Sequence, residues 1–124
     1  MQELDRQTPA ALFPRLGQSV MAFIPWFGEP FASTLRDFTL LVFEHPTYQL
    51  TLLCRGTAVI AIRCSYLVAP PTWAVMDEDA RRFLPRWPWQ RWRGRAGPPL
   101  RMDSGWLLAQ RSVPDYALRA LAAM

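Results

Sequence analysis

Residues 38–66 read FTLLVFEHPTYQLTLLCRGTAVIAIRCSY, and their pattern predicts the centre of the fold. Its apolar side chains alternate, and its two interruptions have the composition of turns. The first is His45-Pro46-Thr47, and the second, Gly56-Thr57, is typical of a two-residue hairpin loop. We therefore expect three antiparallel strands, which cover Phe38 to Glu44, Gln49 to Arg55 and Ala58 to Tyr66.

The segments on either side of these strands indicate helices and a second hairpin. After Pro14, an apolar stripe predicts a helix that Gly28 ends, or that Pro25 ends or kinks earlier, with Leu16, Val20, Phe23, Ile24 and Phe27 on one face. Beyond the strands we expect a short helix over Ala80 to Leu84, strands at Leu100 to Met102 and Trp106 to Ser112, and a last helix from Pro114-Asp115. The predicted fold class is α+β, with an antiparallel sheet of about five strands in the order helix, three strands, short helix, two strands, helix.

Composition predicts a single domain over residues 1–124. The chain is 51% apolar and 19% charged, so it is not disordered by composition. No apolar run approaches the roughly 20 residues that span a bilayer. The N-terminus, Met1 to Asp5, is acidic where a signal peptide is basic, so we expect a cytoplasmic protein.

The two cysteines are expected to be free thiols. If Gly56-Thr57 is the hairpin loop, Cys54 lies opposite Val59 and Cys64 lies opposite Gln49. That register separates the two sulfur atoms along the sheet, and a reducing compartment also disfavours a disulfide.

The net charge of +4 is unevenly distributed. Seven arginines and no acid occur between Arg81 and Arg101, which leaves a net charge of −3 on the rest of the chain. This basic arm, residues 81–101, interleaves its cations with tryptophan and proline, with Arg86, Trp87, Trp89, Arg91, Trp92, Arg93 and Arg95 as its candidate contact residues. Three interpretations stay open: packing or a protein interface, stacking on nucleic acid, and a membrane surface. Every basic residue is Arg and none is Lys, so the charge alone does not favour nucleic acid.

The sequence offers no catalytic, metal or cofactor site that we recognise. His45 is the only histidine, so a base or zinc ligand there has no second histidine to work with. Asp77, Glu78 and Asp79 precede an expected helix, where acids stabilise the N-terminus. There is no glycine-rich phosphate loop and no nucleophile elbow. We expect a binding protein rather than an enzyme.

Two strings resemble segments of the class I type III secretion chaperones, the Tir-chaperone-like family. Residues 91–100 (RWRGRAGPPL) are similar to the segment where the family's second helix gives way to its fourth strand. Residues 102–114 (MDSGWLLAQRSVP) resemble its last hairpin, which runs into a proline before the final helix. The expected order of elements also matches that family.

The resemblance implies a small cytoplasmic chaperone that holds a secreted protein or a secretion-system component in extended form for export. It implies protein partners and a homodimer, although Pro85 and Pro88 interrupt the helix that usually pairs, so a heterodimer stays open. Apolar strand residues would contact the partner. The candidates are Phe38, Leu40, Val42, Trp106 and Leu108. The alternative is a nucleic-acid-binding module that uses the basic arm.

Overall fold

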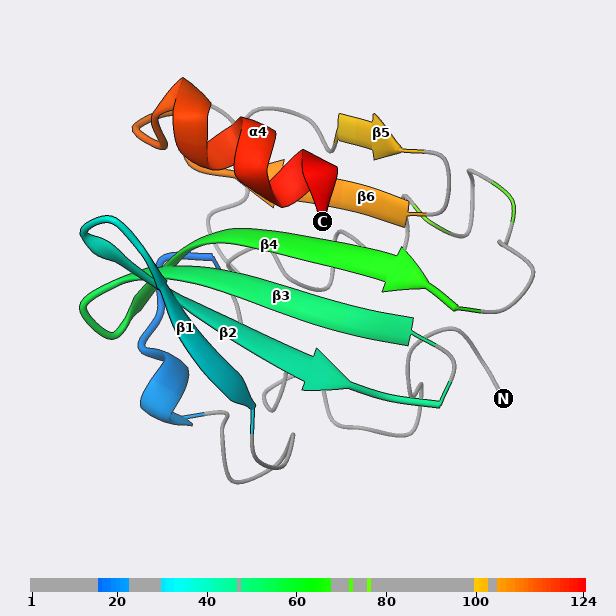
Figure 1. Cartoon of the computed structure of the whole chain (residues 1–124), viewed down its shortest axis with the longest axis horizontal. Coiled ribbons are helices and arrows are strands. Elements are labelled where there is room, and N and C mark those ends of the chain that lie inside the picture. The colour runs from blue at the N-terminus through cyan, green and yellow to red at the C-terminus, as the bar shows by residue number, and fades with distance from the viewer. Residues whose placement is uncertain are drawn as a thin grey trace.

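The computed structural model describes residues 16–22, 30–46, 48–67, 72, 76, 100–102 and 105–124. In these ranges six strands form one antiparallel sheet in the order β1-β2-β3-β4-β6-β5 (Figure 1). The strands are β1 (Phe31–Leu35), β2 (Phe38–Glu44), β3 (Tyr48–Arg55), β4 (Ala58–Tyr66), β5 (Leu100–Met102) and β6 (Gly105–Ala109). The 3-10 helix η2 (Val20–Ala22) precedes the sheet, and the α-helix α4 (Asp115–Ala123) follows it.

The expected central strands are present. β2 and β4 have the predicted bounds, and β3 begins one residue early, at Tyr48. Gly56 adopts a φ of 62° in the β3–β4 loop, a conformation that glycine adopts without steric cost. The second hairpin pairs β5, which has the predicted bounds, with β6, which covers Gly105–Ala109 rather than the predicted Trp106 to Ser112. α4 begins at Asp115, directly after the proline that was expected to open it.

The predicted α+β order of helix, three strands, short helix, two strands and helix is wrong. Instead of a helix, residues 16–22 form a turn, a β-bridge from Ser19 to Ala58, and η2, and the rest of that predicted helix, with Phe23, Ile24 and Phe27, lies outside the described residues. Their backbone bonds to the β3–β4 hairpin, with N–H groups of Gly17 and Val20 donating to carbonyls of Val59 and Thr57 at 2.7 and 2.8 Å. An unpredicted strand, β1, precedes the three expected strands, and the predicted helix over 80–84 lies outside the described residues. The described chain is therefore mostly sheet followed by α4, and Met76 is a further described residue in α-helical conformation, with its N–H donating to the Thr72 carbonyl at 3.0 Å.

The β3–β4 register is as predicted near the loop and shifts by one residue beyond it. Arg55 pairs with Ala58 and Cys54 with Val59, but an irregularity between Leu53 and Cys54 places Cys64 opposite Leu50 rather than Gln49. A bulge of this kind sets two residues of one strand against one of its neighbour. Both cysteines are nevertheless free and buried, which confirms the expected thiols.

Two apolar clusters occupy the two faces of the sheet. On the face that α4 covers, which we call the α4 face, the helix residues Ala117 and Leu121 pack with Phe38, Leu40, Leu53, Ile60, Ala61, Leu107 and Val113. In Figure 1 the helix lies in front of β6, beside β4. The opposite face has the larger cluster, made of Leu16, Val20, Leu41, Phe43, Tyr48, Leu50, Leu52, Cys54, Val59, Ile62, Cys64, Tyr66, Met76, Trp106 and Leu108.

Candidate functional site

β1 is an exposed edge strand. It ends the sheet order, so among the described residues only β2 pairs with it. Its first four residues are exposed and Leu35 is half-buried. Phe31 is 69% exposed, although its neighbour across the ladder is the half-buried Val42. The strand reads FASTL and contains none of the charges or prolines that natural proteins place within exposed edges to prevent pairing.

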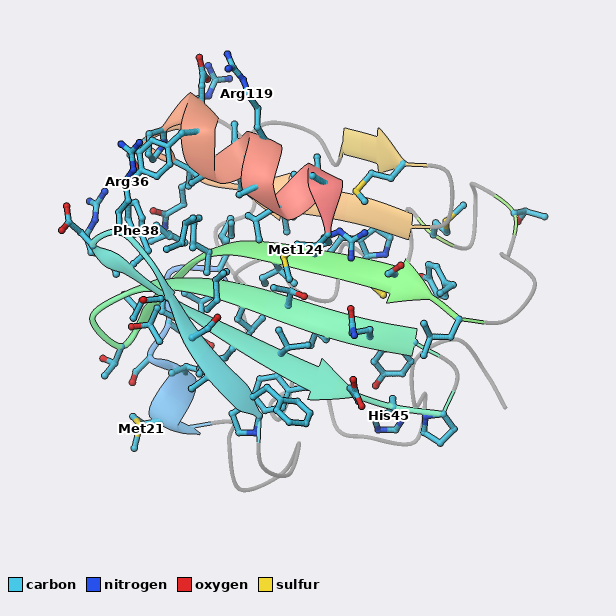
Figure 2. The ribbon with its side chains drawn as sticks, viewed as in Figure 1. Met21, Arg36, Phe38, His45, Arg119 and Met124 are labelled. Atoms are coloured by element: carbon cyan, nitrogen blue, oxygen red, sulfur yellow. The ribbon has the colours of Figure 1, made fainter. Side chains whose placement is uncertain are left out.

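The turn between β1 and β2 is fixed against the start of α4. Arg36 has a φ of 55°, which is uncommon for a residue with a side chain. Its guanidinium lies 4.2 Å from the ring centre of Tyr116, and the Tyr116 ring lies 6.3 Å from that of Phe38. Arg55 approaches the Phe38 ring at 5.6 Å. Figure 2 shows Arg36 and Phe38 at this end of the sheet. These cation–π and ring contacts hold the β1–β2 hairpin in place.

One cross-strand row joins the exposed edge to the interior of the α4 face. Ladder partners follow one another from Phe31 to Val42, Thr51, Arg63 and Leu107. Exposure falls along this row, since Thr51 is 0% and Arg63 is 5% exposed. This row also marks a boundary on the α4 face, because the buried residues that cluster with Ala117 and Leu121 of α4 lie mainly on one side of it.

Arg63 is a buried cation whose hydrogen bonds are incomplete. Its Nη2 donates to the main-chain oxygen of Met124 at 2.6 Å. The Arg63 Nε and the Thr51 Oγ1 are buried atoms without a hydrogen-bond partner. Burial lowers the pKa of Arg63 because it removes water from the charged form, and the neighbouring Cys64 acts in the opposite direction.

The next cross-strand row of the α4 face, which begins at Glu44, is polar. Glu44 pairs with Gln49, Gln49 with Ser65, and Ser65 with Gly105. Glu44 is exposed, and Gln49 and Ser65 are half-buried. The α4 face therefore has an apolar half under the helix and a polar half beside it.

The predicted partner-binding residues lie on two faces rather than one. Phe38, Leu40 and Val42 are on the α4 face, where the first two are buried and Val42 is half-buried. Trp106 and Leu108 are completely buried on the opposite face, where the Trp106 Nε1 donates to the Tyr66 hydroxyl at 3.2 Å. Val42 is thus the most accessible of the five, and binding by any of them stays a prediction.

Sequence reasoning missed Phe31 and the pair Thr51 and Arg63. The signal for Phe31 was the alternation of Phe31, Ser33 and Leu35 before the polar turn Arg36-Asp37. The signal for Arg63 was a charge within an otherwise apolar strand, since it follows Ile62 and precedes Cys64.

Other predicted features are placed only in part. All seven candidate contact residues of the basic arm lie outside the described residues. His45 is half-buried and stacks on Tyr48 with ring centres 4.6 Å apart. Within the described ranges, no three His, Cys, Asp or Glu side chains group as metal ligands do, and no helix is both long and apolar enough to cross a membrane.

Comparisons of this chain with protein-family models, with curated proteins and with solved structures found no match.

Proposed function

We propose that this chain is a cytoplasmic binding protein that takes up an extended segment of another protein along the β1 edge. The partner class that its sequence resemblance suggests is a protein, or a secretion-system component, held for type III export. The observation that carries the proposal is β1 itself, an exposed edge strand without charge or proline in its five residues.

An extended peptide is the occupant that this edge fits. The outer backbone groups of an edge strand pair with another strand, and main-chain hydrogen bonds supply affinity without requiring a particular partner sequence. Phe31 and Val42, neighbours across the ladder, offer apolar contacts beside that edge. A segment held in this way stays extended, which is what export in an unfolded state requires.

β1 is already fixed in position before a partner binds. The Arg36 contact with Tyr116 and the packing of Phe38 beside it hold the β1–β2 hairpin in position against α4. A strand that is already in place loses less conformational entropy when the partner binds.

Two matched lysine variants test the proposal. Ser33→Lys adds a charge to the exposed edge, and Ser112→Lys adds the same charge to an exposed turn beyond β6. Tagged wild type and both variants are used for affinity purification from the native cytoplasm, followed by mass spectrometry. We expect one secreted protein, or a secretion-system component, to be recovered with wild type and Ser112→Lys and lost with Ser33→Lys. Recovery of ribosomal proteins and RNA would instead favour nucleic-acid binding.

The extended segment of the captured protein is then measured directly. Its binding should slow hydrogen exchange of the β1 amides, and a copy of the peptide with methylated backbone nitrogens should bind weakly because it cannot donate the main-chain bonds. Unchanged exchange in β1 would contradict the proposal.

Oligomeric state separates a partner segment from a second copy of this chain. Light scattering of wild type and Ser33→Lys is compared across concentration. If wild type dimerises and Ser33→Lys does not, a second copy occupies the edge and the partner-segment proposal fails. If both have the same mass, the edge is not a self-association surface.

A further inference from the structure

Arg36, in the turn that follows β1, is an exposed cation whose guanidinium is held in one place. The guanidinium lies 4.2 Å from the ring centre of Tyr116, which is half-buried at the start of α4. A guanidinium over a ring face still presents N–H donors beyond the ring, and a carboxylate can accept two of them at once. No carboxylate of the described residues forms an ion pair with Arg36, including that of its neighbour Asp37. Arg36 therefore has positioned donors and no described acid to receive them.

The two ends of β1 differ in charge. Among the described residues, the end beside Leu35 has four exposed arginines and two exposed aspartates, a net charge of +2: Arg36, Asp37, Arg55, Arg111, Asp115 and Arg119. The end beside Phe31 has the exposed Glu44, since Phe31 pairs with Val42 and Glu44 is two residues further along β2. Figure 2 shows Arg36 and Arg119 at one end of the molecule and His45, which follows Glu44, at the other. A single acid on an added strand is therefore favoured beside Arg36 and disfavoured beside Glu44.

Side-chain alternation indicates which residue of an added strand meets Arg36. Leu35 and the Tyr116 ring under Arg36 both pack against the cluster of the α4 face. An added strand places every second side chain on that face. The described strand pairs are all antiparallel, so we expect the added strand to run antiparallel to β1. Its residue two positions before the one beside Leu35 then lies on the α4 face, just beyond the end of β1 and next to Arg36.

We propose that the segment taken up at β1 has an Asp or Glu two residues before the residue that lies beside Leu35, and that this carboxylate pairs with the Arg36 guanidinium. The inference rests on the strand addition proposed above and identifies one side chain of the partner. The pair fixes the register and the direction of the segment, because main-chain hydrogen bonds alone allow shifts of two residues.

Two capped peptides with the same composition and the same charge test the inference. The N-acid peptide is Glu-Thr-Val-Thr-Ser-Thr-Val-Thr-Gln, and the C-acid peptide is Gln-Thr-Val-Thr-Ser-Thr-Val-Thr-Glu. In an antiparallel strand both place their valines beside Leu35 and Phe31, but the acid lies beside Arg36 in the first and beside Glu44 in the second. Because each peptide has one negative charge, general attraction to the basic arm is the same for both.

Each peptide is titrated into the full chain, and calorimetry measures its affinity. Hydrogen exchange of the β1 amides and the ¹H and ¹⁵N signals of the Arg36 Nε–H group locate the bound peptide. We expect the N-acid peptide to bind about fivefold more tightly, which is the upper range for an exposed ion pair. It should also shift the Arg36 Nε proton, which the C-acid peptide should leave in place.

Variants of Arg36 identify the pairing group. Arg36→Gln should reduce the preference for the N-acid peptide to less than about twofold, whereas Arg111→Gln, which removes an exposed arginine from the turn after β6, should keep it. Arg36→Glu reverses the charge, and it should prefer a peptide with lysine in place of the N-terminal glutamate over one with lysine at the C-terminal end. A loosened β1–β2 turn would weaken both lysine peptides alike, so it cannot produce this reversal.

The outcomes separate this inference from strand addition itself. Equal affinity of the two acid peptides, with the β1 amides protected by both, would overturn the pairing with Arg36 and leave strand addition standing. A preference for the C-acid peptide that Arg36→Gln removes would overturn the antiparallel direction. If neither peptide protects the β1 amides, strand addition fails and the inference fails with it.

Discussion

The two faces of the sheet differ in how completely apolar residues cover them. The opposite face is covered by one continuous cluster that includes two tyrosines, Trp106 and two cysteines, and its largest side chain, Trp106, is completely buried. The α4 face has a nine-residue helix over one half, while the other half has a polar row, a buried arginine and an exposed phenylalanine at its edge. Continuous apolar burial stabilises a fold, whereas buried charge and exposed apolar surface are features of binding sites.

The largest effect should come from the opposite face. Trp106→Ala removes the largest fully buried side chain and its hydrogen bond to Tyr66, and should lower the free energy of unfolding by about 3–5 kcal/mol. Urea denaturation followed by far-UV circular dichroism measures this change. A loss below about 1 kcal/mol, the range of ordinary surface changes and mild core swaps, would show that this face does not dominate stability.

The next largest effect on stability should come from α4, which covers half of the α4 face. Leu121→Ala removes the buried leucine of α4 and should cost about 2–3 kcal/mol, at the low end for leucine because a short terminal helix can settle into the space. The same variant should speed hydrogen exchange in α4 before it does so in β3. Equal acceleration in β3 and α4 would mean that the two faces unfold as one unit, and the distinction between them would then not hold for stability.

How far the sequence predicts these faces depends on what kind of information each feature needs. The strands over 38–66 follow from side-chain alternation and from Gly56, both of which are local. The β3–β4 register shifts by one residue at a bulge, so that Cys64 pairs with Leu50 instead of Gln49. Side-chain alternation in the sequence does not reveal such a bulge. Leu16 and Val20 are four residues apart, a spacing that fits a helix, but pairing with the β3–β4 hairpin buries the same two side chains.

The candidate site was less predictable than the strands. Alternation correctly placed Phe38, Leu40 and Val42 on one face and Trp106 and Leu108 together on one face. It could not show that these are different faces, nor that α4 covers Phe38 and Leu40, because both facts depend on long-range packing. β1 was missed because its turn, Arg36-Asp37, has no glycine even though Arg36 adopts a positive φ, which the Tyr116 contact supports.

The exclusion of water from the opposite face can be tested through the pKa of Cys54. Burial raises the pKa of this thiol from 9.0 to about 11. Because the folded pKa lies above the unfolded one, the stabilising effect is complete below about pH 9 and is lost as the pH rises from 9 towards 11. Wild type should therefore lose stability over this window more steeply than Cys54→Ala, as measured by urea denaturation at each pH. Identical slopes, or rapid reaction of the native Cys54 with a thiol reagent at pH 8, would show that water reaches this face.

The smallest effect on stability should come from the exposed end of the row that begins at β1. Phe31 is 69% exposed while Phe38, on the neighbouring strand and the same face, is 6% exposed. Phe31→Ala should change the free energy of unfolding by no more than about 0.5 kcal/mol, as is usual for surface positions. The matched variant Phe38→Ala should cost about 3–5 kcal/mol because it leaves a cavity beneath α4.

In binding, Phe31→Ala should lower affinity for the partner segment by about 2 kcal/mol if the ring is an anchor of the interface. Urea denaturation and calorimetric titration measure the two quantities. A stability loss above about 2 kcal/mol for Phe31→Ala would mean that this ring is part of the folded core, and the edge would then not be open to a partner.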